Sequence, residues 1–143
     1  MPTVKQILAK KGNVVWSIES EKHVYDALQL MAEKDIGALL VYKDKNVAGI
    51  ITERDYARKV ALKGKSAETI QVSDIMTSEV LCTSPNNSIE ECMALMTDKK
   101  IRHLPVVDDG KIVGLISIGD VVKAIISQKE FVIEQLVNYI KGY

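Results

Sequence analysis

The sequence predicts an α/β fold made of two pseudo-symmetric copies of one β-α-β-β-α unit, with a short N-terminal helix and an extended C-terminal helix. Two observations lead to this prediction. The heptapeptide Gly49–Asp55 (Gly-Ile-Ile-Thr-Glu-Arg-Asp) recurs as Gly114–Asp120 (Gly-Leu-Ile-Ser-Ile-Gly-Asp), so that each position returns 65 residues later. Between residues 36–60 and 101–125, seven of 25 positions are identical without a gap. Because neither copy buries its apolar face alone, we expect the two to pack through their sheets around one core.

The first copy begins with a short helix and a strand. Thr3 is a favourable N-cap for a helix over residues 4–10, and Gly12-Asn13 follows where that helix ends. Residues 14–18 are apolar and rich in β-branched side chains, which predicts a strand.

A longer helix and a hairpin come next. Ser20 is expected to cap a helix over about residues 21–35, in which apolar side chains recur at the spacing of one helical face. The apolar runs 38–42 and 47–51 flank a polar turn and predict a hairpin. Thr52 then caps a helix that continues to about residue 63.

The second copy repeats this order. Residues 80–83 predict a strand, and Ser88 with Glu91 predicts a capping box at the start of the following helix. The runs 104–107 and 112–116 predict a second hairpin. Ser117 then opens the last helix.

These elements define the domain organisation. The chain reads as a single module composed of a first repeat, a linker, a second repeat and a helical tail, at 4–63, 64–71, 72–127 and 128–143. The tail carries apolar residues around most of a helix, including Val132, Ile133 and Leu136. These residues form two apolar stripes along the helix. One stripe suffices to pack on the chain's own domain, so the other is expected to pack on a second copy of the chain in a homodimer.

The composition excludes several classes of protein. Lysine and arginine together equal aspartate and glutamate at 19 each, which argues against nucleic acid or an anionic membrane as the partner. No apolar run approaches the roughly 18 residues that span a bilayer, and we expect no secretory signal. Cys82 and Cys92 form neither a Cys-x-x-Cys pair nor a disulfide framework, which favours a reducing, cytoplasmic location.

The repeat, its internal order and the two endings Gly-h-h-[Ser/Thr]-x-x-Asp, where h is apolar, resemble CBS domains, the modules named after cystathionine β-synthase. Two in tandem resemble a Bateman module, and the resemblance spans roughly residues 4–126. It implies a cleft in each repeat for an adenosine-containing regulatory ligand such as AMP, ADP, ATP, NAD or S-adenosylmethionine. It also implies pairing into flat dimers.

The two endings carry suitable chemistry for such a ligand. Thr52 and Ser117 stand where a strand enters a helix, where free backbone N–H groups favour an anion and a hydroxyl can donate to phosphate. Asp55 and Asp120 follow one helical turn later, where a carboxylate can accept from vicinal ribose hydroxyls. The resemblance assigns the same roles. The competing interpretation is an ordinary N-terminal cap with an acidic first turn.

Basic and apolar residues complete the candidate site. The resemblance implies that Arg102 and His103 form a basic pair directed to phosphate, where the first repeat has Gly37-Ala38 and instead carries Arg54. The arginines can equally be solvated surface residues, and His103 a half-buried histidine without a ligand. Side chains expected to contact adenine, for each of which core packing is the alternative, are Val15, Ile36 and Ala38 in the first repeat and Val80 and Ile101 in the second.

The sequence therefore predicts an adenine-nucleotide-binding regulatory module that acts on a separate, unknown partner protein. The alternative is a constitutive interaction or scaffold module with vestigial clefts. We expect no enzyme and no catalytic cofactor, because phosphate-loop and dinucleotide-binding glycine motifs are absent and two histidines without a cysteine pair leave a zinc site without ligands. Ser117, His103 and Asp120 do not form a triad, since the helical spacing directs serine and aspartate toward one ligand.

Overall fold

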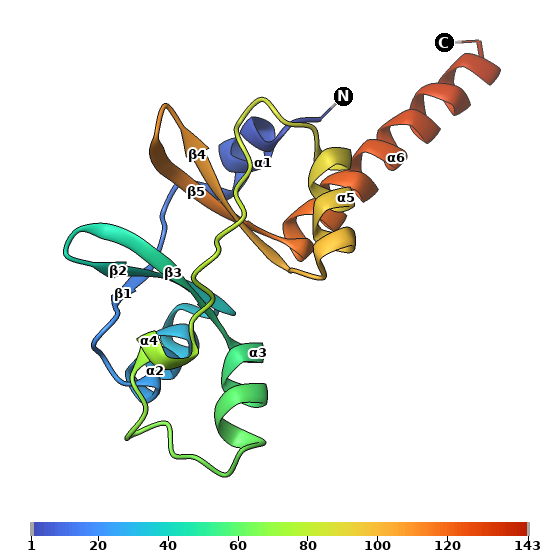
Figure 1. The fold of residues 1–143 in the computed structure, drawn as a ribbon. Helices are drawn as coiled ribbons and strands as arrows, with labels where there is room; N and C mark the ends of the chain where they lie inside the picture. Colours follow the sequence, from blue (N-terminus) through green and yellow to red (C-terminus); the bar gives the residue numbers. More distant parts are fainter. Residues whose placement is uncertain (1, 143) are drawn as a thin grey trace. The chain divides into compact units, whose positions relative to one another are not determined.

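The computed structural model describes residues 2–142, which form two compact units (Figure 1). The central unit spans Val15–Val80, and the terminal unit combines the described residues up to Val14 with those from Leu81 onward. The buried side chains form two clusters, one in each unit, rather than the single core expected.

The central unit is built on a three-stranded sheet in the order β1-β2-β3. The parallel strand β1 is Ser17–Glu19, and β2 (Ala38–Lys43) and β3 (Asn46–Thr52) form the predicted antiparallel hairpin. The helix α2 spans Val24–Lys34. After β3 the chain continues through α3 (Glu53–Tyr56), a π-helical turn (Ala57–Ala61) and α4 (Val72–Ile75). The helix predicted after Thr52 is therefore present, with its second half widened.

The terminal unit has a two-stranded sheet and the longest helix. The helices α1 and α5 are Val4–Lys11 and Ile89–Lys99, and the predicted second hairpin is formed by β4 (His103–Asp108) and β5 (Lys111–Ser117). The helix α6 runs without a break over Ile118–Ile140, so the predicted tail is the continuation of the last helix of the repeat.

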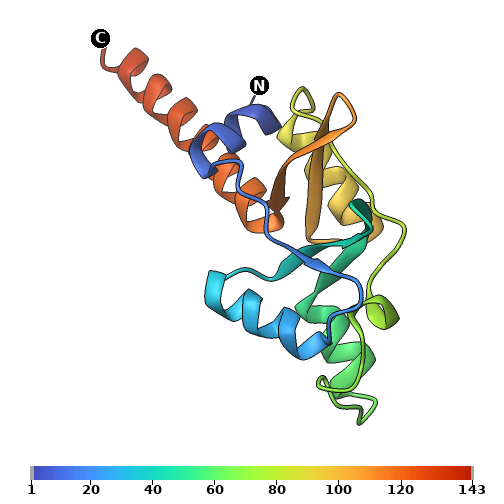
Figure 2. The ribbon, with the colours of Figure 1, turned by 90° about the vertical axis from the view of Figure 1, so that its left-hand side faces the viewer.

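The units do not coincide with the sequence repeats. The first helix of the first repeat, α1, packs on β5 and α6 of the terminal unit (Figure 2), whereas its counterpart α4 packs on β3 of the central unit. Equivalent backbone bonds hold both helix starts: the Lys5 N–H donates to the Pro85 carbonyl and the Ser73 N–H to the Ser20 carbonyl, both at 3.0 Å. Each repeat thus supplies its first helix to the core of the other unit.

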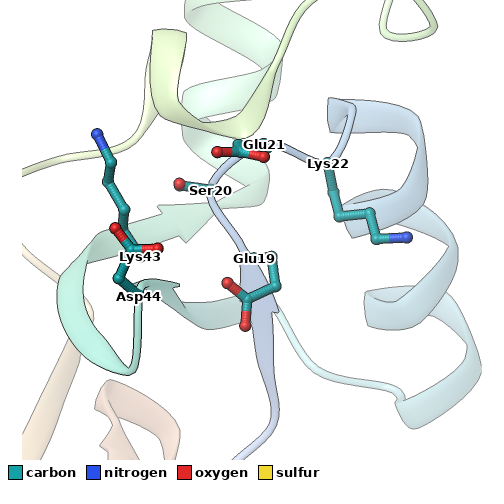
Figure 3. Close-up of a pocket in the computed structure, with 6 residues that line it drawn as sticks. All are labelled: Glu19, Ser20, Glu21, Lys22, Lys43 and Asp44. Carbon is teal, nitrogen blue, oxygen red and sulfur yellow. The ribbon is translucent and has the colours of Figure 1, made fainter.

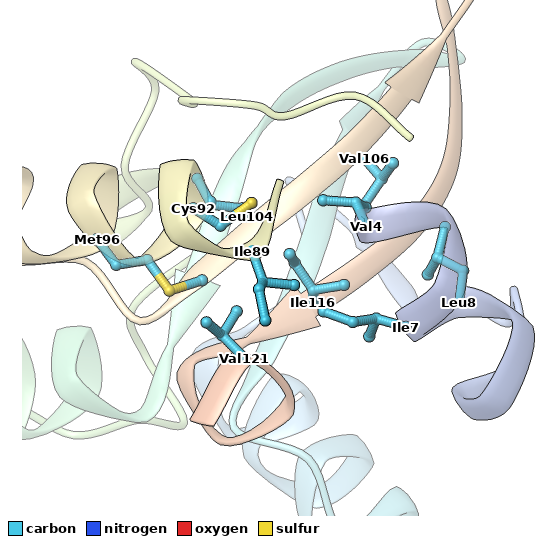
Figure 4. Close-up of a cluster of buried hydrophobic side chains, with 10 residues drawn as sticks. All are labelled: Val4, Ile7, Leu8, Ile89, Cys92, Met96, Leu104, Val106, Ile116 and Val121. Carbon is cyan, nitrogen blue, oxygen red and sulfur yellow. The ribbon is translucent and has the colours of Figure 1, made fainter. Parts of the chain in front are cut away.

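The core of the terminal unit shows this exchange directly (Figure 4). Val4, Ile7 and Leu8 of α1 pack in one cluster with residues of α5, the hairpin and α6. Because these side chains are almost fully buried, α1 is part of the hydrophobic core and not an appendage.

The glycine that opens each heptapeptide is required by these packed segments. A Cβ atom on Gly49 would lie 2.6 Å from the backbone oxygen of Thr77, and one on Gly114 would lie 2.5 Å from Cδ2 of Leu8. Both distances are shorter than real contacts allow, so only glycine lets the crossing segment approach β3 or β5 this closely. The repeated glycine is therefore explained by packing.

Two predicted strands differ from the structure. In place of 14–18, the first strand covers only Ser17–Glu19, and 80–83 forms no strand apart from a single bridge between Thr83 and Val106. Proline explains the second difference. In the central unit the Leu40 N–H donates to the Trp16 carbonyl at 3.2 Å, but the equivalent of Leu40 is Pro105, which has no N–H.

The predicted start of the second helix was also wrong. Ser20 does not cap α2, because its N–H donates to the Tyr42 carbonyl and its own carbonyl accepts from Ser73. His23 is the N-cap, and its N–H donates to the carboxylate of Asp26 at 3.1 Å. The helix ends at Lys34, close to the predicted end, and Asp35 follows as its C-cap in a left-handed conformation.

Candidate functional site

Each heptapeptide places a hydroxyl and a carboxylate at the start of a helix, as predicted. In the central unit Thr52 caps α3, with its hydroxyl accepting from the Asp55 N–H at 3.1 Å. The Asp55 carboxylate accepts in return from the Thr52 N–H at 3.0 Å and from its hydroxyl at 3.1 Å. Ser117 and Asp120 make the same three bonds at the start of α6, at 3.2, 2.8 and 3.1 Å. The cap interpretation is therefore correct for both copies, and a ligand role would come in addition to it.

The two carboxylates differ in their counter-ions. Asp55 pairs with Lys59, one turn further along the helix, at 3.1 Å between Nζ and Oδ1. Asp120 pairs with Lys11 of α1, at 2.6 Å between Nζ and Oδ2. Burial raises the pKa of Asp120, but the bonds from Lys11 and Ser117 outweigh it and hold the pKa below its ordinary value.

Neither lysine was among the predicted site residues. A carboxylate followed four residues later by lysine on a helix is a recognisable signal for Lys59. Lys11 lies 109 positions from Asp120, and the repeat offered no guide to it, because it is the exchange of α1 that brings the two together.

The predicted basic pair lies beside Asp120. His103 opens β4 directly opposite Ser117 in the hairpin, and the Arg102 carbonyl accepts from the Ile118 N–H at 2.8 Å. Burial is the main cause that lowers the pKa of His103; the charges of Lys11 and Arg102 lower it further, while Asp120 opposes them. Arg102 is exposed, so its side chain can reach solvent or an anion.

In the central unit, Gly37 and Ala38 stand at the positions of this basic pair and have no basic side chain. The Gly37 carbonyl accepts from the Glu53 N–H at 3.1 Å, and Ala38 is fully buried at the start of β2, opposite Thr52. Arg54 lies in the first turn of α3 and is half-buried.

The predicted adenine-contacting residues are not all equivalent. Ile36 and Ile101 are half-buried and pack against the cores of the central and terminal units. Val15 and Val80 are half-buried outside the strands. Core packing accounts for the two isoleucines and for Ala38, whereas the two valines belong to neither core cluster.

A hollow of about 410 Å³ in the central unit lies away from these residues (Figure 3). It is lined by Glu19–Lys22, by Lys43 at the end of β2 and by Asp44 in the hairpin turn, at the opposite end of β2 from Ala38. Because its charged side chains have both signs, it shows no preference for an anion.

The Asp120 group can perform two kinds of binding chemistry. Its carboxylate can accept hydrogen bonds from vicinal hydroxyls, and all three cap and lysine bonds to it end on Oδ2, leaving Oδ1 outside these contacts. Lys11 and Arg102 supply positive charge beside the start of a 23-residue helix, whose terminal N–H groups also favour anions. Within residues 2–142, no group of three or more metal-ligating side chains is placed to hold a metal ion.

The lowered pKa of His103 predicts a pH-dependent stability. At pH values between its folded pKa and its unfolded value of about 6.5, the unfolded chain binds a proton that the folded chain does not. Stability should therefore fall as pH drops through about 6.5, by at most roughly 1.4 kcal/mol per pH unit for this group. Urea unfolding of the wild type and His103→Gln at pH 8 and pH 5 measures the effect. The histidine contribution is absent if the substitution has the same cost at both pH values.

The described chain has no helix long and apolar enough to cross a membrane.

Comparison with known proteins agrees with the repeat. A family model described as "CBS domain" matches residues 4–62 and again 72–127. The mitochondrial CBS domain-containing protein CBSX3 of Arabidopsis thaliana is 38% identical, over 98% of this chain and 72% of its own length.

Two solved structures share the fold. A protein with CBS domains from Burkholderia ambifaria MC40-6 is 52% identical with a TM-score of 0.85, over 87% of this chain and 94% of its own. The CBS-domain protein ATU1752 from Agrobacterium tumefaciens is 36% identical with a TM-score of 0.82, over 85% and 98%.

Proposed function

The chain belongs to the CBS domain family, with two such domains in tandem, and on this basis we propose that it is a regulatory module that binds an adenosine-containing ligand and acts on a separate protein. CBS pairs are regulatory modules for such ligands. The Burkholderia relative is provisionally described as a signal-transduction protein, which is consistent with a regulatory and non-enzymatic role. We place the protein in the cytoplasm on its cysteine usage.

The observation that carries the proposal is the doubled hydroxyl–carboxylate pair at a strand-to-helix junction. In each unit the carboxylate is oriented by a backbone N–H and a hydroxyl from the residue three positions before it. An oriented carboxylate can accept from two ribose hydroxyls without an additional entropic cost of ordering its side chain. The partial positive charge at the start of the helix then favours a phosphate on the same ligand.

Regulation requires that the ligand bind one arrangement of the protein better than another. In the terminal unit the site joins three segments, α1 through Lys11, the start of β4 through His103, and the start of α6 through Asp120. A ligand that replaces one of these contacts changes the free energy that holds the segments together, and a partner protein can detect that change.

Thermal and chemical denaturation with added ligands tests the proposal. AMP, ADP, ATP, NAD or S-adenosylmethionine at about 100 times its dissociation constant should stabilise the folded protein by roughly 2.7 kcal/mol. Asp120→Asn should reduce this stabilisation more than it lowers the stability of the ligand-free protein. If none of the five ligands raises the midpoint at millimolar concentration, the regulatory proposal is wrong.

That last outcome would favour a scaffold module instead. Both carboxylates already have a cap and a lysine as partners, so neither needs a ligand to satisfy its charge. A constitutive interaction module would keep these contacts for stability alone, and the denaturation experiment separates the two functions.

We also propose that the protein is a homodimer formed through α6. The apolar residues Val122, Ile126, Ile133, Leu136 and Ile140 recur at spacings of four, seven, three and four on one face of this helix and are all exposed. Ile133 and Leu136 lie outside the core of the terminal unit and are 59% and 56% exposed. The exposure of such large apolar side chains to water is unfavourable, and a second subunit would cover them.

The one charge on this stripe indicates the orientation. Lys129 lies between Ile126 and Ile133, so a parallel two-fold pair would bring two Lys129 side chains together. An antiparallel pair centred near residue 131 instead sets Lys129 beside Glu130 and Glu134 of the second copy. The charge pattern therefore favours the antiparallel dimer.

A further inference from the structure

The contact that the repeat did not predict, between Lys11 and Asp120, bears on which ligand the terminal unit accepts. The Lys11 ammonium donates to Asp120 Oδ2 at 2.6 Å and to the Leu115 carbonyl at 2.8 Å. These bonds tie the last turn of α1 both to β5 and to the first turn of α6. The central unit has no equivalent lysine, because the residue that corresponds to Lys11 in the second repeat is Glu79.

A neutral ligand would disturb this arrangement. Two vicinal ribose hydroxyls that bind Asp120 would use Oδ2 as well as Oδ1 and so compete with Lys11, and the Asp120 side chain is only 24% exposed. The charge-assisted bond from the Lys11 ammonium to the carboxylate is then lost, and a neutral ligand offers no anion in its place. A phosphate group on the same ligand would give Lys11 that partner.

The charge of the whole group points the same way. Lys11 and Arg102 carry two positive charges against the single negative charge of Asp120, and His103 stays neutral near pH 7 because its pKa is lowered. An anionic ligand balances this excess, whereas a cationic sulfonium ligand adds to it.

We propose that Lys11 is the residue that selects a 5′-phosphorylated adenine nucleotide in the terminal unit, over adenosine and over S-adenosylmethionine, by moving from Asp120 to the ligand phosphate. This inference rests on the proposed function. It also makes α1 the segment that responds to the ligand, since Lys11 leaves its bond to Asp120 when the nucleotide binds. Lys11 is a binding residue and has no catalytic role.

Calorimetric titration of the full chain with AMP, adenosine and S-adenosylmethionine tests the inference. The wild type should bind AMP at least roughly tenfold more tightly than adenosine, as expected for a charge-assisted hydrogen bond to phosphate. Lys11→Met keeps the aliphatic stem and removes the charge, and should bring the ratio of the two affinities close to one. Because the ratio is taken within one variant, a loss of stability does not affect it.

Lys10→Met is the matched control, since Lys10 is an exposed neighbour on the same helix and should leave the ratio unchanged. The inference is overturned if Lys11→Met keeps the wild-type ratio, or if Lys59→Met removes the preference instead and places the phosphate beside Asp55. If the wild type binds none of the three compounds, the proposed function itself fails. Binding of AMP with an unaltered ratio in Lys11→Met refutes the role of Lys11 alone.

Discussion

Replacing Gly49 with alanine should destabilise the protein by about 1–3 kcal/mol or more, a large effect for the addition of one methyl group. The new Cβ would lie 2.6 Å from the backbone oxygen of Thr77 and 3.0 Å from the sulfur of Met76. The Thr77 N–H and carbonyl are both bonded to Ile50 in the adjacent strand, at 2.9 and 3.0 Å. Since a paired backbone group cannot turn aside, either this bridge or β3 has to move. Urea unfolding measures the change.

The equivalent substitution in the terminal unit should cost less. At Gly114 the contact is the side-chain end of Leu8, which can change its rotamer where a backbone oxygen cannot. Shortening Leu8 to alanine should cost less stability in the Gly114→Ala background than in the wild type, which a double-mutant cycle measures as a favourable coupling. No side-chain substitution can relieve Gly49→Ala of its clash with Thr77 in this way.

Gly119 is the control within the same motif. Its Cβ would meet only the hydroxyl of Ser117, at an ordinary 3.5 Å, and it lies in the first turn of α6. Gly119→Ala should therefore be neutral or stabilising by up to about 1 kcal/mol, as alanine is in a helix. Equal stability of Gly49→Ala and Gly119→Ala would contradict the packing explanation of the repeated glycine.

Leu136→Glu should convert the proposed dimer to a monomer. Each copy would lose the burial of one leucine, worth about 1.5–3 kcal/mol, and two carboxylates would enter an apolar interface. The two copies together weaken dimerisation by roughly a thousandfold or more. Sedimentation velocity or light scattering at micromolar concentration resolves the change in mass.

The core of the terminal unit should not be affected, because Leu136 lies outside its buried cluster. The unfolding of the monomer is then expected to follow that of the wild type at concentrations where the dimer dissociates. Gln135→Glu adds the same charge to the polar side of α6 and should leave the mass unchanged. A wild type that is monomeric at these concentrations rules out the α6 dimer.

Local patterns predicted most of the secondary structure. Both hairpins, the caps at Thr52, Ser88 and Ser117 and the N-terminal helix are where the sequence indicated, since turn residues, capping side chains and apolar spacing act over a few residues. Where the prediction was wrong, a distant partner decided the outcome. Ser20 bonds to Tyr42 and Ser73 and so does not cap α2, and Pro105 removes the donor that a strand at 80–83 needed.

The candidate site was predictable in part for the same reason. The pairs Thr52–Asp55 and Ser117–Asp120 lie within one helical turn, and the repeat marked them twice. The sequence alone therefore determined the family, the order of elements and the two hydroxyl–carboxylate pairs. The tertiary structure decided which cation each carboxylate receives. Asp55 takes its lysine from its own helix, but Asp120 takes Lys11 from a helix exchanged between the repeats, and packing of α1 against β5 brings that ammonium within 2.6 Å.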